Sequence, residues 1–186
     1  MAEPHALNTT AYALLGLLAV KPWTTYELAQ QMRRGFGDVW PRAESNLYEG
    51  PKALVQAGLA TAAVTATGQR RRTTYSITPE GRAALAEWLG RPSGPPRLEF
   101  EAMVRVIFSE HGTTEQLLAT LRQTREQASA SRATIATLRQ EYEQGQGRFP
   151  ERTRMNLWML RFLEAHFGLI ERWADQTLAE AGAASC

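Results

Sequence analysis

The sequence predicts a mainly α-helical fold: an N-terminal winged helix-turn-helix with a two-stranded wing, followed by an α-helical C-terminal dimerisation domain. Three observations support this fold class. Residues 1–91 contain three helical patterns, a hairpin pattern and a fourth helical pattern, which is the order of a winged helix. Residues 92–97 form a proline-rich linker, and residues 98–186 show helical patterns alone. We therefore expect two domains joined by this linker.

Two helices open the chain, and each has a recognisable start. Asn8 or Thr9 can cap the first, because their side chains accept a hydrogen bond from a free N–H of the first turn. Thr24 begins a capping box with Glu27, and this box predicts the start of the second. A loop over 35–41 follows. The two helices are expected over 9–20 and about 25–34.

The third helix is expected over 42–57 and is the least regular of the four. Ser45 can cap it. Pro51 fits badly inside it, because proline lacks an N–H and its ring clashes with the carbonyl one turn earlier. Two geometries satisfy this constraint. The helix kinks near Gly50, which we favour, or an irregular turn over 45–49 leads into a helix with Pro51 in its first turn.

A hairpin and a fourth helix complete the first domain. Residues 59–67 and 72–77 are predicted strands, joined by a turn over 68–71. Thr78-Pro79 then begins a helix that runs to Gly90, with threonine as the cap and proline at the first helical position.

The C-terminal half is predicted to contain three helices, over about 98–110, 113–144 and 151–181. The second opens with a capping box at Thr113 and repeats a diluted apolar stripe every seven residues. The third carries so wide an apolar surface that one partner helix cannot cover it. A second copy of the chain can bury the remaining apolar surface, and we therefore expect a homodimer. The candidate dimerisation residues are Leu121, Ile135, Leu138, Trp158, Phe162, Leu169, Ile170 and Trp173.

Composition limits the class of protein. Hydrophobic residues make up 44% and charged residues 22%, which is typical of a soluble globular chain. No apolar run is long enough for a membrane span, and the apolar run over 14–20 lacks the flanks of a signal peptide. The single cysteine, Cys186, excludes a disulfide framework. We therefore expect a cytoplasmic protein without membrane contact.

Positive charge is concentrated in the first domain. Residues 1–91 carry ten basic and seven acidic side chains, whereas residues 92–186 carry eleven and twelve. Between Glu49 and Glu80 the chain has basic residues and no acid. A local basic excess fits a polyanionic partner, which makes double-stranded DNA the expected one.

The third helix and the hairpin supply the candidate DNA-binding residues. Asn46 can pair with adenine, and Lys52 can reach guanine or a phosphate. Three adjacent arginines at the predicted hairpin tip suit phosphate or minor-groove contact. An ordinary amphipathic helix and a solvated loop are the alternatives. The full set is Tyr26, Arg42, Ser45, Asn46, Tyr48, Glu49, Lys52, Arg70, Arg71 and Arg72.

Aromatic residues on neighbouring turns of the last helix have two interpretations. Trp158, Phe162 and His166 belong either to the dimer core, which we favour, or to a site for a small, flat aromatic effector. The sequence contains no catalytic motif and no cluster with metal-ligand spacing. We expect no enzyme activity, no cofactor and no bound metal.

The first 90 residues or so resemble the PadR family of bacterial transcriptional regulators. The resemblance lies in the order and spacing of several short motifs, which are Leu15-Gly16-Leu17-Leu18-Ala19, Tyr26-Glu27-Leu28, Leu47-Tyr48, Leu54, Gly58-Leu59, Tyr75, Thr78-Pro79-Glu80-Gly81-Arg82, Leu85 and Trp88-Leu89. Thr25 and the Gly50-Pro51 pair depart from the family pattern. The long helical C-terminal half is similar to that of the larger PadR subgroup, whose members dimerise through it.

The resemblance implies a homodimeric repressor that binds operator DNA and is often released by a small molecule. It also implies that the hydroxyl of Tyr48 can bond a phosphate, and the other interpretation is that the Tyr48 ring belongs to the core. The alternative is a winged-helix module that uses the same surface to bind protein. A salt titration of duplex binding distinguishes the two, because each phosphate contact releases counterions.

Overall fold

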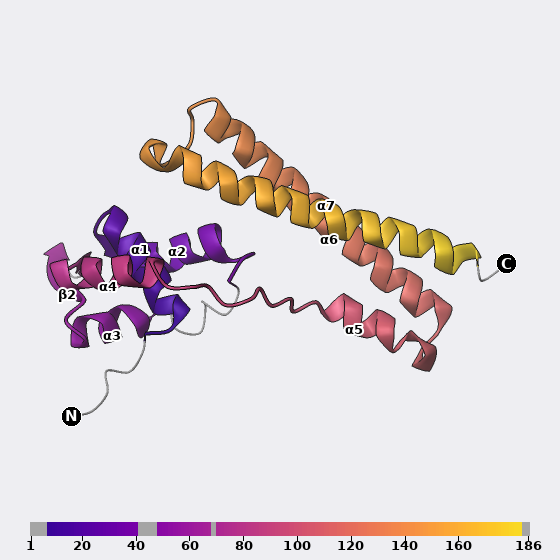
Figure 1. Ribbon diagram of the computed structural model, residues 1–186, viewed down its shortest axis with the longest axis horizontal. Helices are drawn as coiled ribbons and strands as arrows, with labels where there is room; N and C mark the ends of the chain where they lie inside the picture. The colour runs from indigo at the N-terminus through magenta and orange to yellow at the C-terminus, as the bar shows by residue number, and fades with distance from the viewer. Residues whose placement is uncertain (1–6, 41–47, 68–69, 184–186) are drawn as a thin grey trace. The chain divides into compact units, whose positions relative to one another are not determined.

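The computed structural model describes residues 7–40, 48–67 and 70–183. The chain divides into two compact units, Met1–Pro95 and Pro96–Cys186 (Figure 1). The predicted mainly helical fold with a wing is confirmed. No described helix is both long enough and apolar enough to cross a membrane.

The four helices of the N-terminal unit start where their capping residues predict, with one exception. They are α1 (Thr9–Val20), α2 (Thr25–Phe36), α3 (Gly50–Gln56) and α4 (Pro79–Leu89). Asn8 caps α1, Thr24 and Glu27 form the capping box of α2, and Thr78 caps α4. Helix α2 runs two residues beyond the predicted end at Arg34.

The exception is α3, for which the favoured geometry is wrong. Tyr48 and Glu49 form a turn, and the helix begins at Gly50 with Pro51 in its first turn. The physical reason is the missing N–H of proline, which costs nothing in a first turn and breaks the ladder further inside. Residues 42–47 lie outside the described ranges. Gly58 follows α3 with a φ of 73°, a left-handed conformation that favours glycine.

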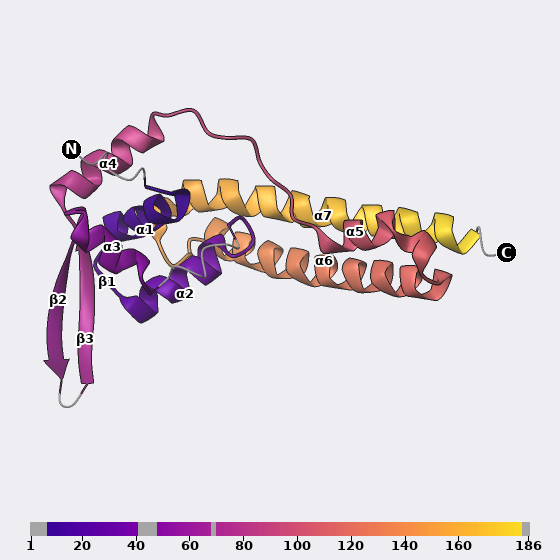
Figure 2. The same cartoon turned by 90° about the horizontal axis from the view of Figure 1, so that it is seen from below.

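The sheet has one strand more than predicted. Strands β1 (Trp23–Thr24), β2 (Ala60–Thr67) and β3 (Arg70–Ile77) pair antiparallel in the order β1-β3-β2. The return strand starts two residues earlier than expected, because Arg70 pairs with Thr67 across the hairpin. Arg70 and Arg71 are therefore strand residues and not turn residues, which corrects the prediction. Strands β2 and β3 extend as a ribbon away from the helices of this unit (Figure 2).

A closed core holds these elements together. Leu14, Leu15 and Leu18 of α1 and Leu28 of α2 are at most 1% exposed. Trp23 is buried between them, and its indole N–H donates to the carbonyl of Leu17 at 2.7 Å. The rings of Tyr12 and Trp88 stack with centroids 4.7 Å apart, which fixes α4 against α1.

The C-terminal unit is an antiparallel pair of long helices with a short helix before it. It contains α5 (Glu101–Ile107), η2 (Ser109–His111), α6 (Thr114–Glu143), η3 (Pro150–Arg152) and α7 (Thr153–Ala183). The predicted helix over 98–110 is shorter, because it starts only where Phe100 packs edge-on against Trp173, after an exposed segment over 91–99. Thr113 caps α6 through the predicted capping box.

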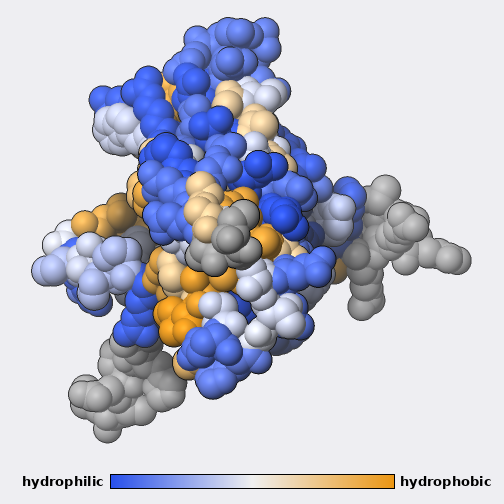
Figure 3. Space-filling view, turned by 90° about the vertical axis from the view of Figure 1, so that its right-hand side faces the viewer, coloured by the Kyte–Doolittle hydropathy of each residue, from blue (hydrophilic) through white to orange (hydrophobic). Residues whose placement is uncertain are grey.

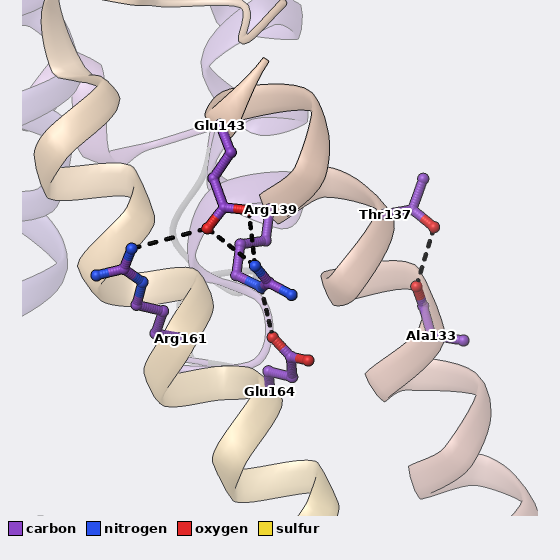
Figure 4. Close-up of polar contacts among 6 residues, drawn as sticks. All are labelled: Ala133, Thr137, Arg139, Glu143, Arg161 and Glu164. Carbon is purple, nitrogen blue, oxygen red and sulfur yellow. Dashed lines mark hydrogen bonds and ion pairs between the residues drawn. The ribbon is translucent and has the colours of Figure 1, made fainter. Parts of the chain in front are cut away.

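Helices α6 and α7 run side by side over most of their length (Figure 2). Ile135 of α6 packs with Leu160 and Leu163 of α7 in a buried cluster. Ion pairs follow the same seam: Arg139 donates to Glu164 of α7 at 2.7 Å and to Glu143 of its own helix at 2.8 Å (Figure 4). One and two heptads earlier on α6, Arg132 pairs with Glu171 and Arg125 with Asp175. These pairs specify the antiparallel register.

Candidate nucleic-acid interface

One face of α3 is fixed in the core, and this determines which side chains point outward. Pro51 and Leu54 are fully buried, and Gly50 lies so close to α1 that a Cβ there would be 2.5 Å from the Cδ1 of Leu14. Glu49 and Lys52 therefore lie on the opposite face and are exposed.

Glu49 and Lys52 form an ion pair on that face. The Nζ of Lys52 donates to the Oε1 of Glu49 at 2.9 Å, and the two side chains are 58% and 74% exposed respectively. The hydrogen bond to Glu49 raises the pKa of Lys52 above its ordinary value. The pair presents a carboxylate and an ammonium side by side to solvent.

Two other predicted residues are exposed tyrosines, and three lie outside the described ranges. Tyr26, at the second position of α2, is 66% exposed, and Tyr48 is 60% exposed, so neither ring is part of the core. Gln56 was not predicted; it is exposed and lies seven residues after Glu49 on the same face. The sequence alone does not single out Gln56, because the seven-residue spacing places it on the exposed face only when the buried face of α3 is known. Arg42, Ser45 and Asn46 lie outside the described ranges.

The wing carries the three arginines on β3. Arg70, Arg71 and Arg72 pair with Thr67, Ala66 and Thr65 of β2, and Arg72 is exposed. Near the base of the wing, hydrogen bonds from the backbone N–H and hydroxyl of Thr24 lower the pKa of Glu27. The positive charges of Lys21 and Arg72 lower the pKa of Glu27 further.

The aromatic residues predicted on the last helix are only partly buried within one chain. Trp158 is 59%, Phe162 62% and Leu169 59% exposed. Figure 3 shows, for one end of the molecule, that apolar residues reach the surface among polar ones. His166 is half-buried and stacks on Phe162 with centroids 6.1 Å apart. The guanidinium of Arg154 lies 5.3 Å from the ring centroid of Trp158.

The remaining predicted dimerisation residues have different surroundings. Leu121 and Ile135 are buried within the unit itself, Ile170 and Trp173 are half-buried, and Leu138 is 38% exposed. On α7 the exposed apolar side chains are Met155, Trp158, Phe162 and Leu169, which we define as the exposed α7 stripe. Within the described ranges, no three His, Cys, Asp or Glu side chains come together as metal ligands.

The order of helices, the exposed polar face of α3 and the wing define a winged helix-turn-helix protein of the DNA-binding class. Residues 14–87 match the profile of the Transcriptional regulator PadR-like family. This match covers less than half of the chain, and the matched family consists of transcriptional regulators and not of enzymes.

One curated relative carries the family's name, and several solved structures share the fold. The Negative transcriptional regulator PadR of Bacillus subtilis (strain 168) is 27% identical over 104 residues, which cover 55% of this chain and 57% of that protein. The crystal structure of smu.1604c from Streptococcus mutans UA159 has a TM-score of 0.80 at 17% identity and covers 93% of this chain and 99% of its own.

Structures of Bacillus subtilis PadR in complex with operator DNA and with p-coumaric acid have TM-scores of 0.74 and 0.68 at 22% and 20% identity. Both cover 94% of this chain and 99% of their own. At these identities the likeness shows a shared fold that includes the C-terminal helices.

Proposed function

We propose that this chain is a homodimeric repressor that binds operator DNA through α3 and the wing, and that a small aromatic ligand releases it. The observation that carries the proposal is the combination, in one winged-helix unit, of a polar outward face on α3 and three adjacent arginines on β3. A helix of this kind reads base edges, while basic side chains beside it bind phosphates.

The exposed α7 stripe supports the dimer. Apolar side chains that recur along one face of a long helix need a partner surface, and a second copy provides one by symmetry. Two copies also suit an operator, because paired recognition helices read half-sites about one DNA turn apart, roughly 34 Å.

The release step rests on the aromatic part of the same stripe. Trp158, Phe162 and the imidazole of His166 offer flat surfaces on which an aromatic ring can stack. The fold is shared with a protein whose structure was solved in complex with p-coumaric acid. A ligand there would lower DNA affinity only if it favours a dimer geometry with wrongly spaced recognition helices.

Replacing Arg70, Arg71 and Arg72 together with alanine tests DNA binding by the wing. We expect weaker binding to every duplex and a salt slope reduced by up to about 3, because phosphate contacts carry little base information. Fluorescence anisotropy of a labelled duplex from the gene's own promoter, at several salt concentrations, measures both quantities.

The matched control replaces Arg97, Arg122 and Arg148 of the C-terminal unit, which changes the net charge equally and should leave both quantities almost unchanged. Equal effects of the two triple variants would mean that the arginines of the wing act only through the net charge of the chain. If the unmodified chain does not bind the promoter duplex at any salt concentration, the DNA-binding proposal itself is wrong.

A further inference from the structure

The ion pair between Glu49 and Lys52 contains a carboxylate, which the binding of phosphates does not require. A basic side chain alone would suit the phosphate backbone, but Glu49 places a carboxylate in front of the same polyanion. Phosphates repel that carboxylate, so its presence on a DNA-facing surface is favourable only if it meets hydrogen-bond donors. In the major groove the donors are the exocyclic amino groups of cytosine and adenine.

The spacing of the two charged groups matches the major-groove edge of a base pair, where a donor and an acceptor lie one hydrogen bond apart. Cytosine N4 donates to guanine O6 within the pair, so these groups lie about 3 Å apart along the groove edge. The Oε1 of Glu49 and the Nζ of Lys52 are 2.9 Å apart. An acceptor and a donor on the protein can therefore face a donor and an acceptor on the DNA.

We propose that Glu49 and Lys52 act together to read one C·G base pair, in which the Glu49 carboxylate accepts from cytosine N4 and the Lys52 ammonium donates to guanine O6 and N7. This inference rests on the proposed function. Guanine places two acceptors side by side, which an ammonium with three N–H groups can bridge. An A·T pair instead offers single acceptors on either side of its donor, and the thymine methyl group has no favourable contact with either charge.

The rest of α3 makes the pair suitable for selective recognition. Pro51 and Leu54 are buried and Gly50 lies against α1, so the backbone that carries both side chains is held by the core. A fixed backbone keeps the acceptor and the donor in a constant relation to the groove, which selective base recognition requires.

Selection of duplexes from a random pool by the full-length chain tests the proposal. We expect one position per half-site at which the unmodified chain prefers C·G over the other pairs by about tenfold or more. Glu49→Gln and Lys52→Gln should each remove that preference at the same position and leave the other selected positions unchanged. Glu80→Gln, in the first turn of α4, is the matched control and should select the same sequences as the unmodified chain.

Three results would overturn the inference while leaving the proposed function intact. The two α3 variants could change different positions, they could change none, or Glu49→Gln could strengthen binding to every duplex equally. The last result would mean that Glu49 only repels phosphates. A pool from which the unmodified chain selects no sequence would overturn the inference and sequence-specific DNA binding together.

Discussion

The two units of this chain differ in how their exposed apolar side chains are distributed. In the N-terminal unit the exposed apolar residues are scattered over separate elements, such as Val64 on β2 and Leu89 at the end of α4. In the C-terminal unit they gather mainly in two places, which are the end of α5, with Val104, Ile107 and Phe108, and the exposed α7 stripe. Scattered apolar residues are normal on a protein surface, whereas a continuous stripe marks a binding face.

Helix α7 has two apolar stripes on opposite sides. Leu160, Leu163 and Ala174 are buried in the unit, and the exposed α7 stripe includes Phe162, two positions after Leu160. Two residues correspond to about 200° around a helix, so the two stripes face almost opposite directions. Helix α6 covers one stripe and leaves the other exposed. We therefore propose that a second copy of the chain covers the exposed α7 stripe.

The largest effect is expected from Phe162→Glu, which puts a charge in the middle of the exposed α7 stripe. If a second copy covers the stripe, burial of an unpaired carboxylate should raise the dimer dissociation constant about 100-fold or more. Analytical ultracentrifugation over a range of concentrations measures this constant. Leu89→Glu is the matched control, since Leu89 is 69% exposed in the other unit. An unchanged dimer in Phe162→Glu would mean that the difference between the units has another cause.

A smaller effect is expected from Trp158→Ala, which asks whether the stripe also binds a ligand. We expect p-coumaric acid, used as the probe, to weaken binding of the unmodified chain to its promoter duplex. Loss of the indole should remove most of that effect, because stacking on an aromatic ring contributes about 1 kcal/mol beyond the area it buries. Anisotropy of the labelled duplex is the measurement, and it does not depend on tryptophan emission.

Trp158→Phe keeps an aromatic ring and should retain the response to the probe. DNA binding without the probe should be similar in all three proteins. If p-coumaric acid and related phenolic acids leave the DNA affinity of the unmodified chain unchanged, the stripe is a subunit interface alone.

Most helix starts could be predicted because their causes are local. Asn8, Thr24, Thr78 and Thr113 each satisfy a free backbone N–H within three residues, so the sequence around each cap contains the whole interaction. Strand β1 could not be predicted in this way. It has two residues and exists because Trp23 and Thr24 pair with Tyr75 and Thr74, far along the chain.

The sequence predicts which residues form the candidate DNA-binding surface better than it predicts where the fold places them. The arginines were recognisable as a basic cluster, but their place in β3 depends on the pairing register of Arg70 with Thr67. The sequence predicts that Lys52 and Glu49 point outward from the third helix, and both side chains are exposed. The start of that helix at Gly50, with Pro51 buried in its first turn, is harder to predict because it depends on contacts with the rest of the core.

The smallest effect concerns the N-terminal unit alone and comes from Glu27, the acid of the α2 capping box. Hydrogen bonds from Thr24 lower the pKa of Glu27 below its ordinary value of 4.5. A carboxyl with a lowered pKa in the folded state stabilises the protein above the pKa of the unfolded state, and this contribution is lost as the pH falls through the folded pKa. Glutamine accepts the same hydrogen bonds without titrating.

On acidification from pH 6 to pH 3, Glu27→Gln should therefore lose less stability than the unmodified chain, by about 0.5 kcal/mol or less because the group is partly solvated. The midpoint of urea denaturation, followed by circular dichroism at both pH values, measures the difference. Glu115→Gln is the matched control, since Glu115 is in the first turn of α6 while Gln116 completes that capping box. Because the α2 box lies wholly within the N-terminal unit, the effect should persist in Phe162→Glu. An effect that disappears with the dimer would show that the two units are not energetically independent.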